Sequence, residues 1–292
     1  MIDLHSHSSA SDGILSPADS ARYAFEKKLT VWALTDHDTV DGLNDAAKVC
    51  LETGVNFIPG IEITVAWPEG EFHLLGLGLR RKSEELKNTI EYLTEDRFNR
   101  NSEIVRKMNE DDYDFTLEEI QSNSTASQIG RPHFADFLVK KGIVRNRQEA
   151  FDRFLGHGKK WYVNHTGENL ETAVEAIKTS GGIPVIAHPC SLFVGIARLE
   201  EELEKIHAAG VMGLEAWHPG ARKSHCYRLE EIARKLGMFV TAGSDFHGKG
   251  VRADRHLGRM FDNKKIDDRF WFEELKPALG EDFDFKNTEW AK

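Results

Sequence analysis

Several histidines and acids in this sequence stand at the spacing that metal chelation needs. His5 and His7 lie two residues apart, and so do Asp245 and His247. Side chains alternate along an extended segment, so each pair would project to one side as a minimal chelate. Glu62 lies between two isoleucines, and a lone carboxylate in an apolar run needs a partner. These residues therefore indicate divalent metal ligands.

Other histidines and one acid lie beside apolar runs and extend this set. They are Asp12, His37, His73, His188 and His218. Taken one at a time, each has an ordinary alternative as a hydrogen-bonded side chain, and Asp12 precedes a glycine as turn residues often do. Gathered in one place, they would bury many unpaired polar atoms at a large cost unless cations paired with them. Imidazole and carboxylate together suit Zn²⁺, Mn²⁺ or Fe²⁺.

Short apolar runs along the chain are typical of buried β-strands, and amphipathic segments separate most of them. The runs are 2–4, 31–35, 56–65, 72–79, 183–187, 211–216 and 238–242. This alternation predicts an α/β fold whose mostly parallel sheet closes, or nearly closes, into a barrel. The carboxyl ends of parallel barrel strands meet at one rim, where active sites are built. Because most of the candidate ligands follow these runs, we expect them to converge there.

The pattern changes after residue 81. One long charged helix is expected over about 81–108, followed by shorter helices at 117–120, 132–140 and 147–154. We therefore predict a helical insertion over 82–166 that acts as a substrate-binding lid, and a barrel made of residues 1–81 and 167–292. Arg97 and Arg100 lie on the long helix and could reach over the rim, but because most such arginines only solvate a helix, we expect them to do the same. Trp161 and Tyr162 fit core packing better than stacking on a base.

The composition limits which binding partners and which cellular compartment we expect for this protein. The chain has 292 residues and a formal net charge of −10, with 38 Lys and Arg against 48 Asp and Glu. Duplex DNA binding needs a basic face, so it is not expected, although a local basic pocket for a small phosphate ester fits. Three cysteines without a C-x-x-C pair favour a reducing compartment. Without a signal peptide or a long apolar span, we expect a cytoplasmic protein that has no membrane partner.

The arrangement of these residues resembles a known family. The segment Asp3–Gly13 (DLHSHSSASDG), the tetrapeptides Thr35–Asp38 (TDHD) and Ser244–His247 (SDFH), and the separate Glu62, His73 and His188 are similar to motifs of the polymerase and histidinol phosphatase (PHP) family. The resemblance covers roughly residues 1–80 and 168–260. It implies a distorted (β/α)₇ barrel with a helical insertion and three divalent metal ions at the rim.

The resemblance also implies which residues hold each ion. One ion would be bound by His5, His7, Glu62 and Asp245, a second by Glu62, His73 and His188, and the third by Asp12, His37 and His247. Glu62 would bridge the first two ions. Asp12 replaces a histidine found in some relatives, and the added carboxylate favours Mn²⁺ over Zn²⁺ or Fe²⁺. Such ions activate water and neutralise phosphoryl charge, and Asp245 would be a catalytic residue.

Within the family, the insertion is similar to that of small nucleotide phosphatases. The segment Gly130–His133 (GRPH) carries this similarity. It implies a hydrolase that removes the 3′-phosphate from nucleoside 3′,5′-bisphosphates such as pAp, leaving the nucleoside 5′-monophosphate, and that also trims short 5′-phosphorylated RNA as an exonuclease. Arg131 and His133, near a helix N-terminus, are candidates to hold a phosphate. His218 would hold a phosphate or protonate the leaving oxygen, and Ser244 would contact substrate.

Two alternatives stay open. The first keeps the metals and changes the substrate, giving a histidinol-phosphate phosphatase, another small phosphomonoesterase, or a nuclease that acts on longer nucleic acid. The second is a metal-binding PHP domain without catalysis, which the full ligand set disfavours.

Overall fold

A single sheet of seven strands forms the core of the computed structural model, which describes residues 1–292 except 69–70, 125, 127, 250 and 253. The strands lie side by side in sequence order. Their bounds are β1 Ile2–Asp3, β2 Val31–Leu34, β3 Asn56–Val65, β4 Phe72–Leu77, β5 Ile183–Ile186, β6 Gly213–Trp217 and β7 Phe239–Ala242.

The sheet curls until its first and last strands approach each other. The chain just after β1 forms a parallel bridge between Ser6 and Phe246, and the amide of His7 donates to the carbonyl of Phe246 at 2.8 Å. Neighbouring strands are parallel except around β4, which runs antiparallel to both β3 and β5. The predicted nearly closed seven-stranded α/β barrel is confirmed, with one strand reversed.

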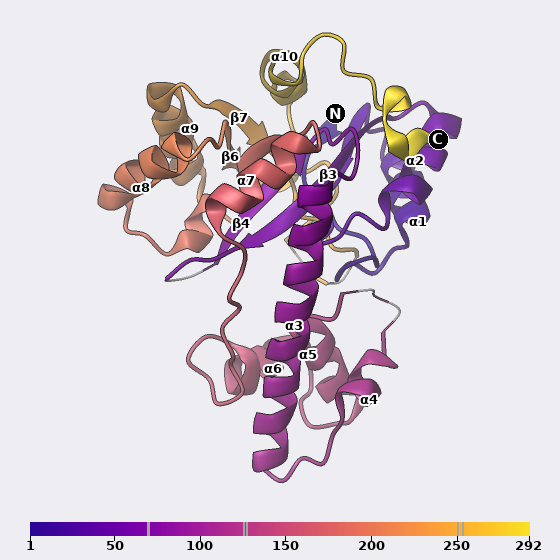
Figure 1. Cartoon of the computed structure of the whole chain (residues 1–292), viewed down its shortest axis with the longest axis vertical. Coiled ribbons are helices and arrows are strands. Elements are labelled where there is room, and N and C mark those ends of the chain that lie inside the picture. The colour runs from indigo at the N-terminus through magenta and orange to yellow at the C-terminus, as the bar shows by residue number, and fades with distance from the viewer. Residues whose placement is uncertain (69–70, 125, 127, 250, 253) are drawn as a thin grey trace.

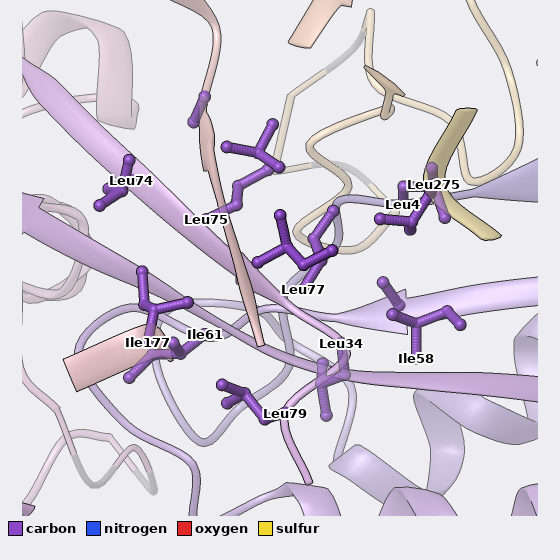
Figure 2. Packing of buried hydrophobic residues seen from close by; sticks show 14 of the residues in the cluster. Leu4, Leu34, Ile58, Ile61, Leu74, Leu75, Leu77, Leu79, Ile177 and Leu275 are labelled. Carbon is purple, nitrogen blue, oxygen red and sulfur yellow. The ribbon is translucent and has the colours of Figure 1, made fainter. Parts of the chain in front are cut away.

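Helices surround the barrel (Figure 1). They are α1 Pro17–Glu26, α2 Leu43–Thr53, α7 Leu170–Thr179, α8 Ile196–Ala208 and α9 Lys223–Leu236. Local sequence explains their ends. The Ser16 hydroxyl accepts the Asp19 amide at 3.1 Å, with Pro17 in the first turn, and Gly54 ends α2 with φ +79°. Figure 2 shows leucines and isoleucines from β2, β3, β4 and α7 filling the interior.

The helical insertion has an apolar core of its own. It contains α3 Glu84–Glu110, α4 Leu117–Gln121, α5 Arg131–Lys140 and α6 Arg147–Ala150, and a π-helical turn follows at Phe151–Leu155. The helix α3 belongs to both parts of the molecule (Figure 1). Leu86 and Leu93 pack into the barrel cluster, whereas Ile104 and Met108 pack with the insertion, where Trp161 stacks on Phe154.

Residues after β7 cover the barrel in a way that the sequence analysis did not anticipate. Short helical turns, with α10 at Lys276–Leu279, place Phe270, Trp271, Phe285 and Trp290 in the barrel cluster. Among the described residues, no helix is both long enough and apolar enough to span a bilayer.

Candidate active site

The predicted metal ligands come together at one rim of the barrel. They come from the segment after β1 (His5, His7, Asp12), the loop after β2 (His37), the middle of β3 (Glu62), the start of β4 (His73), the end of β5 (His188) and the loop after β7 (Asp245, His247). Their ligand atoms form overlapping groups within 4.8 Å: His7, Asp12, His37 and His247; His5, His7 and Asp245; His5, Glu62 and His188; and His37, Glu62 and His73.

The reversal of β4 brings His73 into this cluster. In the antiparallel register His73 pairs with Thr64, two residues beyond Glu62 on β3. The first residues of β4 therefore lie at the rim that the neighbouring strands reach with their last residues. A parallel fourth strand would place His73 at the opposite end of the barrel.

Glu62 lies at the centre of the cluster and is fully buried. Its Oε1 lies 2.9 Å from Nε2 of His188 and 3.1 Å from Nδ1 of His73. Its Oε2 lies 3.2 Å from Nε2 of His7 and 3.1 Å from Nδ1 of His37. Nε2 of His5 also lies 3.3 Å from Oε2, so each carboxylate oxygen faces its own set of imidazoles. A carboxylate has lone pairs enough to bridge two cations.

Hydrogen bonding leaves several polar atoms of the cluster without a suitable partner. The Nε2 atoms of His5 and His7 face each other at 3.1 Å, and each lies within 3.7 Å of Oδ1 of Asp245. In the described part of the chain, the buried Nδ1 of His7 and Oε2 of Glu62 have no partner in hydrogen-bond geometry. Buried polar atoms normally have one. Ring nitrogens and carboxylate oxygens thus point their lone pairs into one space without enough hydrogen-bond donors, an arrangement that fits divalent cations.

Electrostatics keep the acids of the cluster ionised. Burial alone would raise the pKa of Glu62, but the nearby His37 and His5 outweigh it and hold that pKa well below its ordinary value. The pKa values of Asp12 and Asp245 are lowered against burial in the same way, with His247 as the leading favourable charge. Ionised carboxylates are the form that binds cations.

Glu215 supports two ligands from behind the cluster. Its Oε1 accepts Nδ1–H of His5 at 3.0 Å, and its Oε2 accepts the His188 amide at 2.8 Å. A carboxylate behind a metal-binding histidine fixes the tautomer and the ring orientation. The sequence analysis missed Glu215, although it is a lone acid between Leu214 and Ala216, the same signal that identified Glu62.

Two further buried aspartates fasten the loops that carry ligands. Asp3 accepts the backbone amides of Ser244 at 2.9 Å and Gly258 at 2.7 Å, so it holds the segment that leads into Asp245. Asp36 accepts the amide of Ser8 at 2.8 Å, which fixes the turn that follows His7. These contacts position ligand-bearing loops before any ion binds.

Backbone strain also marks the site. His188 has φ 24° and Asp245 has φ 54°, a region that residues other than glycine rarely adopt. Such conformations persist where surrounding contacts enforce them, and they cluster at functional sites. Gly243 allows the close approach nearby, because a Cβ there would lie 2.2 Å from Cβ of His5.

A cavity of about 420 Å³ opens between the cluster and the insertion. Its barrel side is lined by Asp12, His37, Glu71, His73, His188, His218, Asp245, His247, Arg252 and Arg255, and its insertion side by Arg97, Arg100, Arg131, Tyr162 and His165, among others. An acidic chain thus carries a basic wall opposite its imidazoles.

Two of the predicted substrate residues line this cavity. Arg131 forms an ion pair with Glu71, and its guanidinium lies over the Tyr162 ring at 5.3 Å. His218 is buried, its Nε2 lies 3.5 Å from Oδ2 of Asp245, and that nitrogen has no hydrogen-bond partner among the described residues. Both side chains lie beside the space that a substrate would fill.

The other two predicted substrate residues lie outside the lining of the cavity. Nδ1 of His133 accepts the Gly130 amide at 2.9 Å, so it caps the start of α5. Ser244 is fully buried, and its hydroxyl donates to Asp3 at 2.5 Å. His133 thus holds the backbone of Gly130, whereas Ser244 is held by Asp3 through both its hydroxyl and its amide.

Arg97 and Arg100 require a correction. We expected them to solvate the long helix, but they are 8% and 6% exposed and line the cavity. The periodicity of a charged helix cannot reveal this, because the face that carries them is covered by the barrel rim and by the start of α5. Trp161 is buried in the insertion core as expected, whereas Tyr162 reaches the cavity.

The fold agrees with those of known proteins. The PHP domain family model matches residues 3–182, and the chain belongs to this family. It is a metal-dependent hydrolase of phosphoric esters. It is 31% identical over 273 residues to a 3′,5′-nucleoside bisphosphate phosphatase of Chromobacterium violaceum, covering 93% of this chain and 95% of that one.

Two other similar proteins point the same way. A 5′-3′ exoribonuclease of Haemophilus influenzae is 31% identical over 245 residues, covering 84% of this chain and 89% of the relative. The crystal structure of a proposed metal-dependent phosphoesterase of Bifidobacterium adolescentis superposes with a TM-score of 0.83 at 30% identity, covering 96% of both chains.

Proposed function

We propose that this protein removes the 3′-phosphate from nucleoside 3′,5′-bisphosphates of the pAp type, giving the nucleoside 5′-monophosphate and phosphate. The similarity to a nucleoside bisphosphate phosphatase over nearly the full length of both chains carries the proposal. The cavity supports it, because a ligand-rich wall and an arginine-rich wall face the same space. Cytoplasmic location and the lid role of residues 82–166 stay predictions.

The residues at the rim fit three divalent ions, for which we propose Mn²⁺. His5, His7, Glu62 and Asp245 would hold one, Glu62, His73 and His188 a second, and Asp12, His37 and His247 the third. Bound there, such ions supply Lewis acidity, which activates water near neutral pH and neutralises phosphoryl charge.

The chain itself binds and orients the ester. His218 lines the cavity on the barrel side, and its Nε2 lacks a hydrogen-bond partner among the described residues, so it is placed to hold the reacting phosphoryl group or the leaving oxygen. Arg131 reaches in from the first turn of α5 and would bind the phosphate that does not react.

A parallel assay tests this substrate assignment. The Mn²⁺-loaded enzyme should release phosphate from adenosine 3′,5′-bisphosphate faster than from histidinol phosphate at equal concentrations. The Asp245→Ala variant serves as the inactive control, with circular dichroism to confirm that it folds. Release from histidinol phosphate but not from the bisphosphate would overturn the assignment and favour the histidinol-phosphate alternative.

Exonucleolytic trimming of short 5′-phosphorylated RNA is a second candidate activity. It is favoured by the similarity to a 5′-3′ exoribonuclease at the same identity. A 5′-phosphorylated RNA pentamer in the same assay should be shortened from its 5′ end, and a 5′-hydroxyl pentamer should be a poor substrate. Equal digestion of both oligomers would contradict this activity.

A further inference from the structure

Among the residues that the structure describes, Arg100 is a buried cation without an acidic partner. It lies on α3, is 6% exposed and lines the cavity. Its Nε and Nη2 donate to Oδ1 of the adjacent Asn101 at 3.3 and 2.9 Å, and no described carboxylate forms an ion pair with it. A guanidinium cannot lose its proton in a protein, so its charge must be buried as such. An unpaired buried charge is strongly destabilising.

The other arginines that line the cavity each have an acid. The pairs are Arg97 with Asp38, Arg131 with Glu71, Arg252 with Asp245 and Arg255 with Asp254. These acids are thus already engaged, and Arg100 is left as a surplus positive charge on the insertion wall. The missing counter-charge points to a ligand.

Two neighbouring arginines, Arg97 and Arg131, add positive charge around Arg100, which further favours the binding of an anion there. Burial first, and then the charges of Arg97 and Arg131, hold the pKa of Arg100 well below its ordinary value, although the more distant charges of Asp38 and Asp96 oppose this shift. A Cβ on Gly130 would lie 3.4 Å from Nη1 of Arg97, which places that guanidinium at the start of α5 beside Arg131. Nε of Arg97 is itself buried without a partner among the described residues. Three guanidinium groups therefore share one end of the cavity, and in the described part of the chain only two of them, those of Arg97 and Arg131, form an ion pair with an acid.

We propose that Arg100, with Arg97 and Arg131, binds the terminal phosphate of the substrate that is not hydrolysed, and that Arg100 makes the enzyme select ligands carrying two phosphates. Guanidinium groups bind phosphate through paired, charge-assisted hydrogen bonds. A terminal phosphate monoester carries close to two negative charges, which suits a surplus cation better than a diester does. This inference rests on the proposed function and adds the residue that reads the second phosphate.

Matched substrates test the selection. The Mn²⁺-loaded enzyme and its Arg100→Met variant are compared on adenosine 3′,5′-bisphosphate and on adenosine 3′-monophosphate, which lacks only the second phosphate. Arg100→Met should lower kcat/KM for the bisphosphate about 100-fold, as loss of a partner from a buried charge pair does. It should leave kcat/KM for the monophosphate unchanged. Arg100→Lys should recover part of the preference.

A control variant and a stability measurement separate recognition from a structural role. Arg106→Met removes an exposed arginine of the same helix that pairs with Glu103 and Glu110. This variant should change kcat/KM for neither substrate. Because no described acid forms an ion pair with Arg100, Arg100→Met should not lower the unfolding midpoint of the ligand-free protein. An equal loss of activity on both substrates, or a lowered midpoint, would show that Arg100 is structural and overturn the proposal.

Binding without turnover distinguishes failure of this inference from failure of the proposed function. Binding is measured by calorimetry on the metal-free protein. Adenosine 5′-monophosphate should bind to the wild type and to Arg106→Met, but not to Arg100→Met. Adenosine should bind to none of the three proteins. If the wild type hydrolyses neither nucleotide but shows this binding pattern, the anion site stands and the reaction assignment fails. If inorganic phosphate binds as tightly as adenosine 5′-monophosphate, the site takes free phosphate and the proposed selection is wrong.

Discussion

Glu215 and His5 are 210 positions apart in the chain, and their side chains meet at 3.0 Å behind the ligand cluster. The contact joins β6 to the end of β1, so it also supports the closure of the barrel. The same carboxylate accepts the amide of His188, which has a strained φ of 24°. One acid therefore orients one ligand and stabilises the backbone of another.

Replacing Glu215 with Gln should weaken metal binding and activity while leaving the fold intact. Loss of a carboxylate behind a metal-binding histidine typically costs about 10- to 100-fold in affinity or rate. Metal titration followed by kcat/KM measurement would show it. Glu201→Gln, at an exposed site on α8, is the matched control and should behave as wild type. Unchanged metal affinity in Glu215→Gln would contradict the supporting role.

Removal of metal should abolish turnover and lower stability. Dialysis against a chelator leaves the carboxylates and imidazoles of the cluster without their counter-ions, and added Mn²⁺ should restore activity. A ligand at about 100 times its dissociation constant stabilises the folded state by about 2.7 kcal/mol, so the unfolding midpoint should rise with added Mn²⁺. Full activity in a chelator-treated sample, verified metal-free by elemental analysis, would refute the metal requirement.

Arg131→Ala should act mainly on KM. If Arg131 holds the phosphate that does not react, it binds ground state and transition state alike, and kcat is preserved. The expected rise in KM for adenosine 3′,5′-bisphosphate is about 10- to 100-fold, the equivalent of a charge-assisted hydrogen bond. Arg153→Ala, which removes an insertion arginine paired with Glu149, should leave KM unchanged. A large loss of kcat at constant KM would place Arg131 on the reacting phosphate instead.

Asp96 should make stability depend on pH in the acid range. Its Oδ2 accepts the amides of Thr166 and Gly167 and lies 2.5 Å from Nδ1 of His165. Burial opposes these contacts, but they prevail and hold the pKa of Asp96 well below its ordinary value of 3.8. The stability it contributes is therefore present above pH 4 and is lost as the pH falls further.

Denaturant unfolding of the metal-free protein would measure this effect. Asp96→Asn should lose about 1 kcal/mol at neutral pH, because the pair is only partly buried. The difference from wild type should shrink below about pH 4, where the Asp96 carboxyl becomes protonated in the unfolded chain while it stays ionised in the folded protein. Glu95→Gln, an exposed neighbour on the same helix, is the control. A difference that stays constant down to pH 2 would show that Asp96 does not act through its charge.

The sequence was sufficient to predict the barrel and the convergence of the ligands because both depend on local patterns. Apolar runs mark the strands, and polar residues next to strand ends must meet at a rim once the strands are parallel. Glu62 was recognisable because its carboxylate stands alone in an apolar strand. The same rule applies to Glu215, and its absence from our prediction reflects an incomplete search for this signal.

Other features could not be predicted, because they depend on contacts between distant segments. The direction of β4 is not encoded in its apolar run, since parallel and antiparallel strands share the same side-chain alternation. The burial of Arg100 depends on where the rim and α5 lie beside α3. The packing of Phe285 and Trp290 against the barrel likewise follows from tertiary contacts.

The reversed fourth strand has a consequence for how the insertion is built. Because β4 runs antiparallel to its neighbours, the chain leaves it at the end of the barrel opposite the ligand-bearing rim. The helix α3 must therefore run along the barrel before it reaches the opening of the site (Figure 1). With 27 residues, at about 1.5 Å of rise each, it spans about 40 Å. Arg97 and Arg100 lie part-way along α3, about one turn apart. The rise of the helix therefore sets how far along the barrel they lie, and its turn sets the direction in which they project. Deleting one residue of α3 before Arg97 would shift both arginines back along the helix axis and rotate them by about 100° away from the opening. Every metal-ligand atom would stay in place.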